Sequence, residues 1–547
     1  MRKLVSTLLL FLGLCSSCNF LDTSVYDQLG ESNLYRNEAS CMSGLAGVYD
    51  VLGYSDVYGQ NLWGDLDSGT DILVYNREYG KNNLQVSMYT YNNTDATLNN
   101  TWRALYMGVN RANDYMDLIS QRTDKECGGA SKKAMFIAEA KALRAVFYMN
   151  LLSFWGEVPL RITSIRDLST QLLKKSPQQD VFNQIIKDLS EAESGCLPAT
   201  SLNTPGRISR TTVQALLART YLWQSGYPTY ANTWDKALSY ARKVRDSKLH
   251  SLYPETDGKN GYIALFINMC SNKYDLTARE SMFEVEFYGN GLEKSNESGK
   301  VGLYNGISQG QVDDPDVPFA YAWYNATRIL FRLYEPTGDA RKWWNFADYS
   351  YKRNEQTKRI EKLYLTEAQK ITYEKIPATR NPGKWRAEYD PIRPWARNNS
   401  SINYPIMRYA DVLLMIAEAS NEMSGPSQEV IDAINLIRGR AGATLIQLAD
   451  YVDKEALRRF IFEERTRELC FEVPRRMELR RMGEQFYFDQ INLLKDQGVD
   501  INRQPIGYQY DDVHATPAIN IGIRHLYMPI PQIELNTNPI CGQAPNW

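Results

Sequence analysis

The chain has 547 residues, and its 62 Lys and Arg side chains nearly balance its 64 Asp and Glu side chains, leaving a formal charge of −2. A nearly neutral chain has no field that would attract a polyanion, so we expect no nucleic-acid partner. Aromatic residues make up 12% of a chain whose mean hydropathy is −0.45, so many rings must lie near polar groups or solvent, as in proteins that bind sugars or peptides.

The N-terminus has the pattern of an export signal. Met1-Arg2-Lys3 precedes an apolar run from Leu4 to Leu14, which is too short to cross a bilayer as a helix. The run ends in Cys15-Ser16-Ser17-Cys18, and small residues before a Cys are typical of lipoprotein processing sites. We therefore predict a signal peptide over residues 1–17 and an acylated Cys18 that anchors the mature chain in lipid. A redox pair of Cys15 and Cys18 is disfavoured because both lie at the edge of the apolar signal.

Two short acidic loops offer the oxygen ligands that calcium prefers. They contain Asp65, Asp67 and Asp71, and Asp313, Asp314 and Asp316. In the first loop, Gly69 and Asn76 do not stand where an EF-hand needs its Gly and its final Glu. We therefore expect no cofactor, and calcium is the one alternative that the sequence leaves open.

The first half of the chain alternates amphipathic helices with polar turns. In residues 102–119, apolar side chains recur at three- and four-residue steps and predict one buried face: Leu105, Val109, Ala112, Met116 and Ile119. A helix over 136–155 is apolar nearly all round and is expected at the centre, and Gly156 and Pro159 end it. Further helices are predicted over 180–192, 211–224 and 234–244. Helix pairs with short turns and small contact residues predict tetratricopeptide-like units.

Residues 253–400 differ in composition, with many Gly, Asn, Ser, Pro and aromatic residues and few long periodic faces. Loops of this kind often carry binding residues on a rigid scaffold. We therefore expect ligand-binding residues in this region.

Helices return after residue 400. Tyr409 to Glu422 has an apolar face, Ser427 stands where it would cap a helix through Arg440, and another helix starts near Asp453. The Glu and Arg residues from Glu463 to Glu468 include groups able to act in acid-base catalysis. Their neighbours are apolar, which favours ion pairs between packed helices.

The residue types most used in catalysis are few or scattered. The three His residues, His250, His514 and His525, have no metal-ligand spacing. The Cys residues beyond the signal have no zinc-type spacing and are interpreted as packed thiols or occasional disulfides: Cys41, Cys127, Cys196, Cys270, Cys470 and Cys541. Most His-dependent hydrolases and metal enzymes are thereby excluded, and we expect a protein that is not an enzyme.

Several segments resemble signatures of the SusD/RagB family, in that family's order and over nearly the full chain. After Cys18, residues 19–22 (Asn-Phe-Leu-Asp) are similar to the opening of mature family members. The most specific match is YPIMRYADVLLMIAEA at residues 404–419. Further similar segments are residues 138–145, 155–160, 206–209, 434–442, 463–469, 526–531 and 536–539. One departure follows Glu472, where Val-Pro-Arg-Arg-Met-Glu at 473–478 replaces the family's Gly-His-Arg-aromatic-aromatic-Asp type of run.

The resemblance implies a mainly α, SusD-like fold with four tetratricopeptide-like helix pairs that support an irregular, loop-rich ligand-binding region. We accordingly divide the mature chain into an N-terminal helical part (18–252), a loop-rich insertion (253–400) and a C-terminal helical part with the tail (401–547). The resemblance also implies a lipid-anchored protein on the outer face of the outer membrane. There it would bind an oligosaccharide or peptide and deliver it to a SusC-like TonB-dependent receptor.

Two groups of side chains form the predicted binding site. Sugar rings stack their C–H faces on flat aromatic rings, and their hydroxyls need Asp, Asn or Arg partners. The first group lies where the resemblance places ligand-binding rings, and it comprises Trp63, Asp67, Tyr75, Asn76, Arg77, Tyr79, Tyr89 and Tyr91. The second comprises Tyr304, Asn305, Tyr321, Trp323 and Tyr324. For any single ring, packing in the core or within a loop is the competing interpretation.

Two other functions remain open. A secreted glycoside hydrolase needs two carboxylates held about 5–10 Å apart in a cleft, an arrangement that a sequence does not reveal. A tetratricopeptide scaffold that binds only protein would differ in having no soluble ligand on its aromatic loops.

Overall fold

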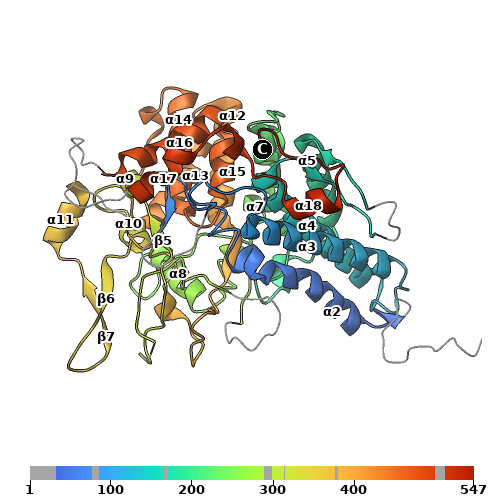
Figure 1. The fold of residues 1–547 in the computed structure, drawn as a ribbon, viewed down its shortest axis with the longest axis horizontal. Helices are drawn as coiled ribbons and strands as arrows, with labels where there is room; N and C mark the ends of the chain where they lie inside the picture. Colours follow the sequence, from blue (N-terminus) through green and yellow to red (C-terminus); the bar gives the residue numbers. More distant parts are fainter. Residues whose placement is uncertain are drawn as a thin grey trace, which may run out of the picture.

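The computed structural model describes residues 33–76, 85–165, 171–288, 299–312, 314–375, 380–498 and 512–547. Helices dominate these residues, and the strands form short antiparallel pairs (Figure 1). The prediction of a mainly α fold is confirmed. In the described ranges no helix combines the length and the apolar character that crossing a membrane requires.

Eight helices form a series in which each contacts the next. They are α3 (Ala96–Ser120), α4 (Ala130–Trp155), α5 (Gln178–Ala192), α6 (Arg210–Ser225), α7 (Trp234–Asp246), α12 (Tyr409–Ser424), α13 (Gln428–Ala441) and α14 (Lys454–Leu469). Consecutive members make four pairs, as predicted for tetratricopeptide-like units. The chain leaves this series after α7 and returns at α12, so the residues between them are an insertion held by the helical body (Figure 1).

In sequence, the remaining α-helices precede α3, follow α14 or belong to the insertion. They are α2 (Glu38–Tyr49), α8 (Gly261–Cys270), α9 (Arg328–Leu333), α10 (Ala340–Asn345), α11 (Glu367–Lys375), α15 (Arg475–Arg481), α16 (Glu484–Asn492), α17 (Asp512–Asn520) and α18 (Gln532–Thr537). The strand pairs are β1 (Leu73–Tyr75) with β5 (Tyr324–Ala326), β2 (Val158–Pro159) with β3 (Lys175–Ser176), β4 (Ser281–Val285) with β8 (Tyr404–Arg408), and β6 (Tyr349–Arg353) with β7 (Ile360–Tyr364).

Local sequence explains the bounds of the long helices. Asp95 caps α3 by accepting a hydrogen bond from the backbone N–H of Thr97 at 2.9 Å, and all five apolar side chains predicted for its inner face are buried. Helix α4 ends where predicted, at Gly156, whose φ of +72° suits Gly, but it begins earlier, at Ala130. The prediction that Ser427 caps a helix is only half right. Ser427 holds the N-cap position of α13, but its side chain makes no capping hydrogen bond.

Buried ion pairs join α14 to its neighbours. Glu464 accepts hydrogen bonds from Arg341 at 2.7 Å and Arg438 at 2.9 Å, and Glu468 accepts one from Arg440 at 2.5 Å. Burial opposes ionisation of Glu468, but the surrounding guanidinium groups, Arg440 first among them, lower its pKa to about 2. The interpretation of residues 463–468 as ion pairs between packed helices is therefore confirmed.

The segment that departs from the family pattern, residues 473–478, begins α15 and is tightly held. Arg475 forms a salt bridge with Asp71 at 2.6 Å, and Arg476 donates to the backbone oxygen of Ser68 at 2.9 Å. Arg481, at the other end of α15, pairs with Glu418 of α12. Helix α15 thus connects the loop around residue 70 to the helical series.

The six described cysteines are all buried and unbridged, which agrees with their interpretation as packed thiols. Two of them, Cys41 on α2 and Cys127 in the turn before α4, have sulfur atoms 4.0 Å apart. The hydrophobic core that contains all six extends from α2 to the C-terminal tail.

Candidate functional site

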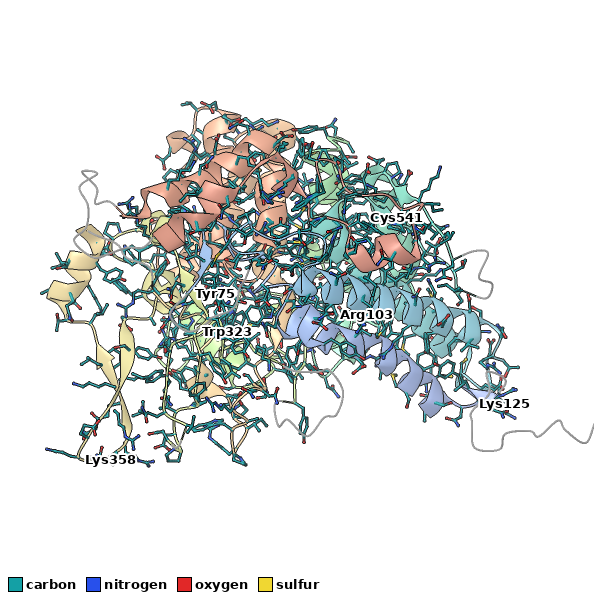
Figure 2. All side chains as sticks on the ribbon, viewed as in Figure 1. Tyr75, Arg103, Lys125, Trp323, Lys358 and Cys541 are labelled. Atoms are coloured by element: carbon teal, nitrogen blue, oxygen red, sulfur yellow. The ribbon has the colours of Figure 1, made fainter. Side chains whose placement is uncertain are left out.

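The two loop regions predicted to bind ligand meet in the structure. Strand β1 pairs with β5 so that Tyr75 lies opposite Tyr324, and the backbone N–H of Asn76 donates to the carbonyl oxygen of Trp323 at 2.6 Å. Figure 2 shows Tyr75 and Trp323 close together at the base of this pair. Segments about 250 residues apart in sequence therefore share one surface.

Three of the predicted aromatic residues lie beneath that surface. Trp63, Tyr75 and Tyr324 are all buried, with ring centroids 6.0 Å apart for Trp63 and Tyr324 and 6.2 Å apart for Tyr75 and Tyr324. The Tyr324 hydroxyl donates to Asp65, and burial raises the pKa of that carboxyl to about 6. The Trp63 indole N–H donates to the backbone oxygen of Tyr58 at 2.8 Å. These rings support the surface from inside.

Asp67 holds the start of α15. Its two carboxylate oxygens accept hydrogen bonds from the backbone N–H groups of Arg475 at 2.7 Å and Arg476 at 3.0 Å. The side chain is 7% exposed, and burial raises its pKa to about 7. Because both oxygens of this buried carboxyl cap α15, we interpret Asp67 as a structural residue.

Tyr89 and Tyr91 are also buried, and they pack toward the C-terminal part. The Tyr89 hydroxyl lies 3.2 Å from that of Tyr487, and the Arg476 guanidinium lies 4.4 Å from the centroid of the Tyr89 ring. Tyr91 contacts Trp547, with ring centroids 5.3 Å apart. The structure therefore does not bring these two tyrosines to the β1–β5 surface.

The second predicted group forms a compact set of rings beside β5. Trp323 stacks on Tyr304 with centroids 3.9 Å apart and an interplanar angle of 11°, and Tyr321 meets Tyr304 edge-on at 5.4 Å. Phe319 packs edge-on against Tyr321 at 4.5 Å. Tyr304 is buried, whereas Tyr321 and Trp323 are partly exposed. We call Tyr304, Phe319, Tyr321 and Trp323 the aromatic platform.

The loop over residues 389–400 borders this platform, and sequence reasoning did not single out its residues. The Tyr321 hydroxyl donates to the side-chain oxygen of Asn398 at 2.9 Å, and the Arg397 guanidinium lies 4.9 Å from the Phe319 ring centroid. In the same loop the guanidinium of Arg393 lies 4.0 Å from the ring centroid of Trp395. The available signal was a Trp among Arg and Asn residues, Trp-Ala-Arg-Asn-Asn at 395–399.

Asn305, expected to supply a polar partner beside the rings, is fully buried next to Tyr304. Neither of its side-chain amide atoms has a hydrogen-bond partner in the described residues. It therefore lies behind the platform, out of reach of a ligand on the exposed face.

The acidic loops considered for calcium have internal partners. Asp71 pairs with Arg475, Asp65 and Asp67 accept the hydrogen bonds described above, and Asp314 accepts from the backbone N–H groups of Asp316 and Val317, each at 2.9 Å. Within the described ranges no group of three or more His, Cys, Asp or Glu side chains is arranged to hold a metal ion.

Two family models together match nearly the whole chain. The model of the SusD family matches residues 226–547, and the model described as starch-binding, associating with the outer membrane, matches residues 19–222. The chain belongs to the SusD family. The resemblance seen in the sequence is therefore confirmed.

Relatives of this SusD family protein align over almost its full length. SusD-like protein P25 of Formosa agariphila is 24% identical over 554 residues, covering 96% of this chain and 95% of the relative. The structure of a SusD homologue from Bacteroides thetaiotaomicron is 25% identical, with a TM-score of 0.83 over 94% of this chain and 98% of that one. The SusD-like fold is thereby confirmed.

Two structural neighbours name a ligand. A laminarin-binding SusD-like protein matches with a TM-score of 0.67 and 24% identity over 94% of this chain and all of the other. A structure with xylogluco-oligosaccharide matches with a TM-score of 0.68 and 19% identity over 92% of this chain and 97% of the other. At these identities the likeness to our SusD family protein concerns the fold.

Some predictions for this SusD family protein fall outside the described residues. They concern Cys18, Arg77, Tyr79 and Asp313. These residues, and the three-part division at 252 and 400, stay predictions.

Proposed function

We propose that this protein binds an oligosaccharide on the aromatic platform, without changing it chemically, and delivers it to a SusC-like TonB-dependent receptor. The observation that carries the proposal is the partly exposed Trp323 ring, held in a stack with Tyr304. Asn398, Lys300 and Arg397 contact the other rings of the platform. A flat ring with hydrogen-bonding neighbours matches the two faces of a sugar. The laminarin-binding and xylogluco-oligosaccharide neighbours favour a glycan over a peptide.

Binding without hydrolysis fits the surroundings of Asp65, the carboxyl group hydrogen-bonded to Tyr324 next to Trp323. Asp65 is buried, and its oxygens accept hydrogen bonds from Tyr324 and, at 3.1 Å, from Gln60. A glycosidase needs a pair of carboxyl groups that reach the glycosidic bond from opposite sides. Asp65 lies at the hydroxyl end of Tyr324, where burial and these hydrogen bonds favour a structural role.

The test compares two tryptophans by isothermal titration with the glycan that induces expression. Trp323→Ala should weaken binding about ten- to a hundredfold, because a well-placed interface aromatic contributes about 1–3 kcal/mol. Trp63→Ala is the matched control, since it removes a buried Trp and should lower stability without removing the exposed ring. Unchanged affinity in a folded Trp323→Ala variant would contradict the proposal. Shortened glycan released during the titration would favour a hydrolase, and binding of peptide or folded protein alone would favour a peptide carrier or a protein-binding scaffold.

We further propose that Cys18 carries the lipid anchor, because small residues precede it after an apolar signal. Cys18→Ala should release the protein from outer membranes, measured by fractionation and by incorporation of labelled palmitate. Retention of label in that variant would show that another residue is acylated.

The proposed receptor partnership rests on family membership and on a family description that refers to the outer membrane. A TonB-dependent receptor should co-purify with the protein in mild detergent from native membranes. Quantitative proteomics that finds no such receptor above background would reject the partnership and leave glycan binding to its own test.

A further inference from the structure

Two cationic side chains flank the aromatic platform. The Lys300 ammonium lies 5.7 Å from the centroid of the Tyr304 ring, and the Arg397 guanidinium lies 4.9 Å from that of Phe319 and 6.0 Å from that of Tyr321. The Lys300 ammonium also donates to the backbone oxygen of Asn398, the residue after Arg397. Both positive charges therefore belong to one surface.

Across the described part of the chain, neither of these cations forms a salt bridge, and two carboxylates of the surrounding loops have other partners. Asp316 pairs with Arg359 at 3.0 Å, and Asp390 accepts hydrogen bonds from the hydroxyls of Ser400 at 3.0 Å and Ser401 at 2.7 Å. In the helical body the pattern is the opposite, because Arg408 alone contacts three carboxylates. Among the described residues, Lys300 and Arg397 are thus left without a carboxylate partner.

The pKa of Lys300 reflects the absence of a carboxylate partner. Partial burial lowers the pKa of its ammonium to about 8, and within the described ranges no carboxylate counteracts that effect. A bound anion would supply the missing charge. It would also leave the ring contacts of Lys300 and Arg397 intact, since a cation can face a ring on one side and an anion on another.

Building on the proposed glycan function, we propose that the platform selects an anionic oligosaccharide, with a carboxylate or sulfate group bound by Lys300 and Arg397 and an adjacent sugar ring packed on Trp323. Guanidinium groups bind both oxyanions with paired hydrogen bonds, and an ammonium group adds a point charge. Arg393, in the same loop and close to the Trp395 ring, lies near the negative charges of Asp390 and Asp316, so the anion site is assigned to Lys300 and Arg397 alone.

The experiment uses the full chain in mild detergent and three immobilised glycans: polygalacturonate for carboxylate, a sulfated galactan for sulfate, and a neutral β-glucan. The wild type should prefer at least one anionic glycan, and this binding should weaken as salt is raised. Lys300→Met and Arg397→Gln should each lower affinity for that glycan about tenfold. Lys358→Met, in the turn of the β6–β7 hairpin and far from Trp323 in Figure 2, is the matched control and should leave affinity unchanged.

A pH series separates a charge contact from loss of structure. Affinity of the wild type for the anionic glycan should fall as pH rises through about 8, because the Lys300 ammonium loses its proton there, whereas Lys300→Met should show no such fall. Binding of the neutral glycan alone, or anionic binding that survives both platform substitutions, would overturn the anionic preference and leave the proposed function standing. Binding of none of the three would count against both.

Discussion

Glu284 has a carboxyl group that is buried in the folded protein. It lies on β4, is 3% exposed, and accepts a hydrogen bond from the side-chain amide of Asn403 at 3.1 Å. Burial raises its pKa from 4.5 to about 7. The folded protein therefore binds this proton more tightly than the unfolded chain does, so stability from this group is present below pH 4.5 and is lost as pH rises toward 7.

Replacing Glu284 should remove part of the pH dependence of the free energy of unfolding. Glu284→Gln should unfold with a free energy close to that of the wild type near pH 4.5, and above pH 7 it should be more stable by up to about 3 kcal/mol, because each pKa unit corresponds to about 1.4 kcal/mol. Urea denaturation at several pH values measures this, with the exposed Glu255→Gln as control. Parallel pH profiles for Glu284→Gln and the wild type would show that Glu284 ionises in the folded protein without lowering its free energy of unfolding.

Single residues are also where sequence reasoning about the site was weakest. Trp63 and Trp323 both lie in segments rich in Tyr, Gly and Asp, yet one is buried against Tyr404 and the other is partly exposed. The difference depends on partners hundreds of residues away, which one sequence does not reveal. Trp395 was missed for the converse reason, because a lone Trp in a polar loop gives no cluster to notice.

At the scale of elements, the cap on α15 links the loop around residue 70 to the C-terminal helical part. Asp67→Ala would leave the backbone N–H groups of Arg475 and Arg476 without acceptors, and each unsatisfied buried donor costs about 1–3 kcal/mol. We expect a loss of about 2–4 kcal/mol in the free energy of unfolding, measured with urea. Asp67→Asn retains an acceptor and should lose less. If Asp67→Ala instead kept its stability and lost glycan affinity, Asp67 would be a ligand-binding residue after all.

Helices were the elements that the sequence predicted best. A period near 3.6 residues is a local signal, so α5, α6, α7 and α12 lie close to their expected ranges, whereas α3, expected from residue 102, begins earlier at Ala96. The hairpin of β6 and β7 was not predicted, because β7 is almost entirely exposed and the alternation in β6 is only five residues long. Pairing of β1 with β5 has no local signal of any kind.

The stability of the whole molecule depends on buried ion pairs as well as on apolar packing. Arg408 is 1% exposed and joins Glu280 before β4 at 2.7 Å, Glu468 on α14 at 3.1 Å and Glu472 beyond it at 2.5 Å. Removing one member of such a cluster leaves uncompensated charge inside the protein.

Arg408→Met should therefore lower the free energy of unfolding by about 3–5 kcal/mol. Arg36→Met, which breaks the exposed pair with Glu126, should cost at most about 1 kcal/mol. Urea denaturation of both variants at neutral pH gives the comparison. Equal effects would mean that the cluster has enough remaining cations to compensate for the loss.

The pairing of β1 with β5 bears on how ligand preference can diversify. The base of the platform is set by three backbone pairs, from Leu73 opposite Ala326 to Tyr75 opposite Tyr324, and main-chain hydrogen bonds do not depend on which side chains stand nearby. Substitutions at positions such as 321, 323 and 397 can accumulate while descendants inherit the helical body unchanged. After gene duplication, a few substitutions on the platform would therefore be enough to give one copy a different ligand preference.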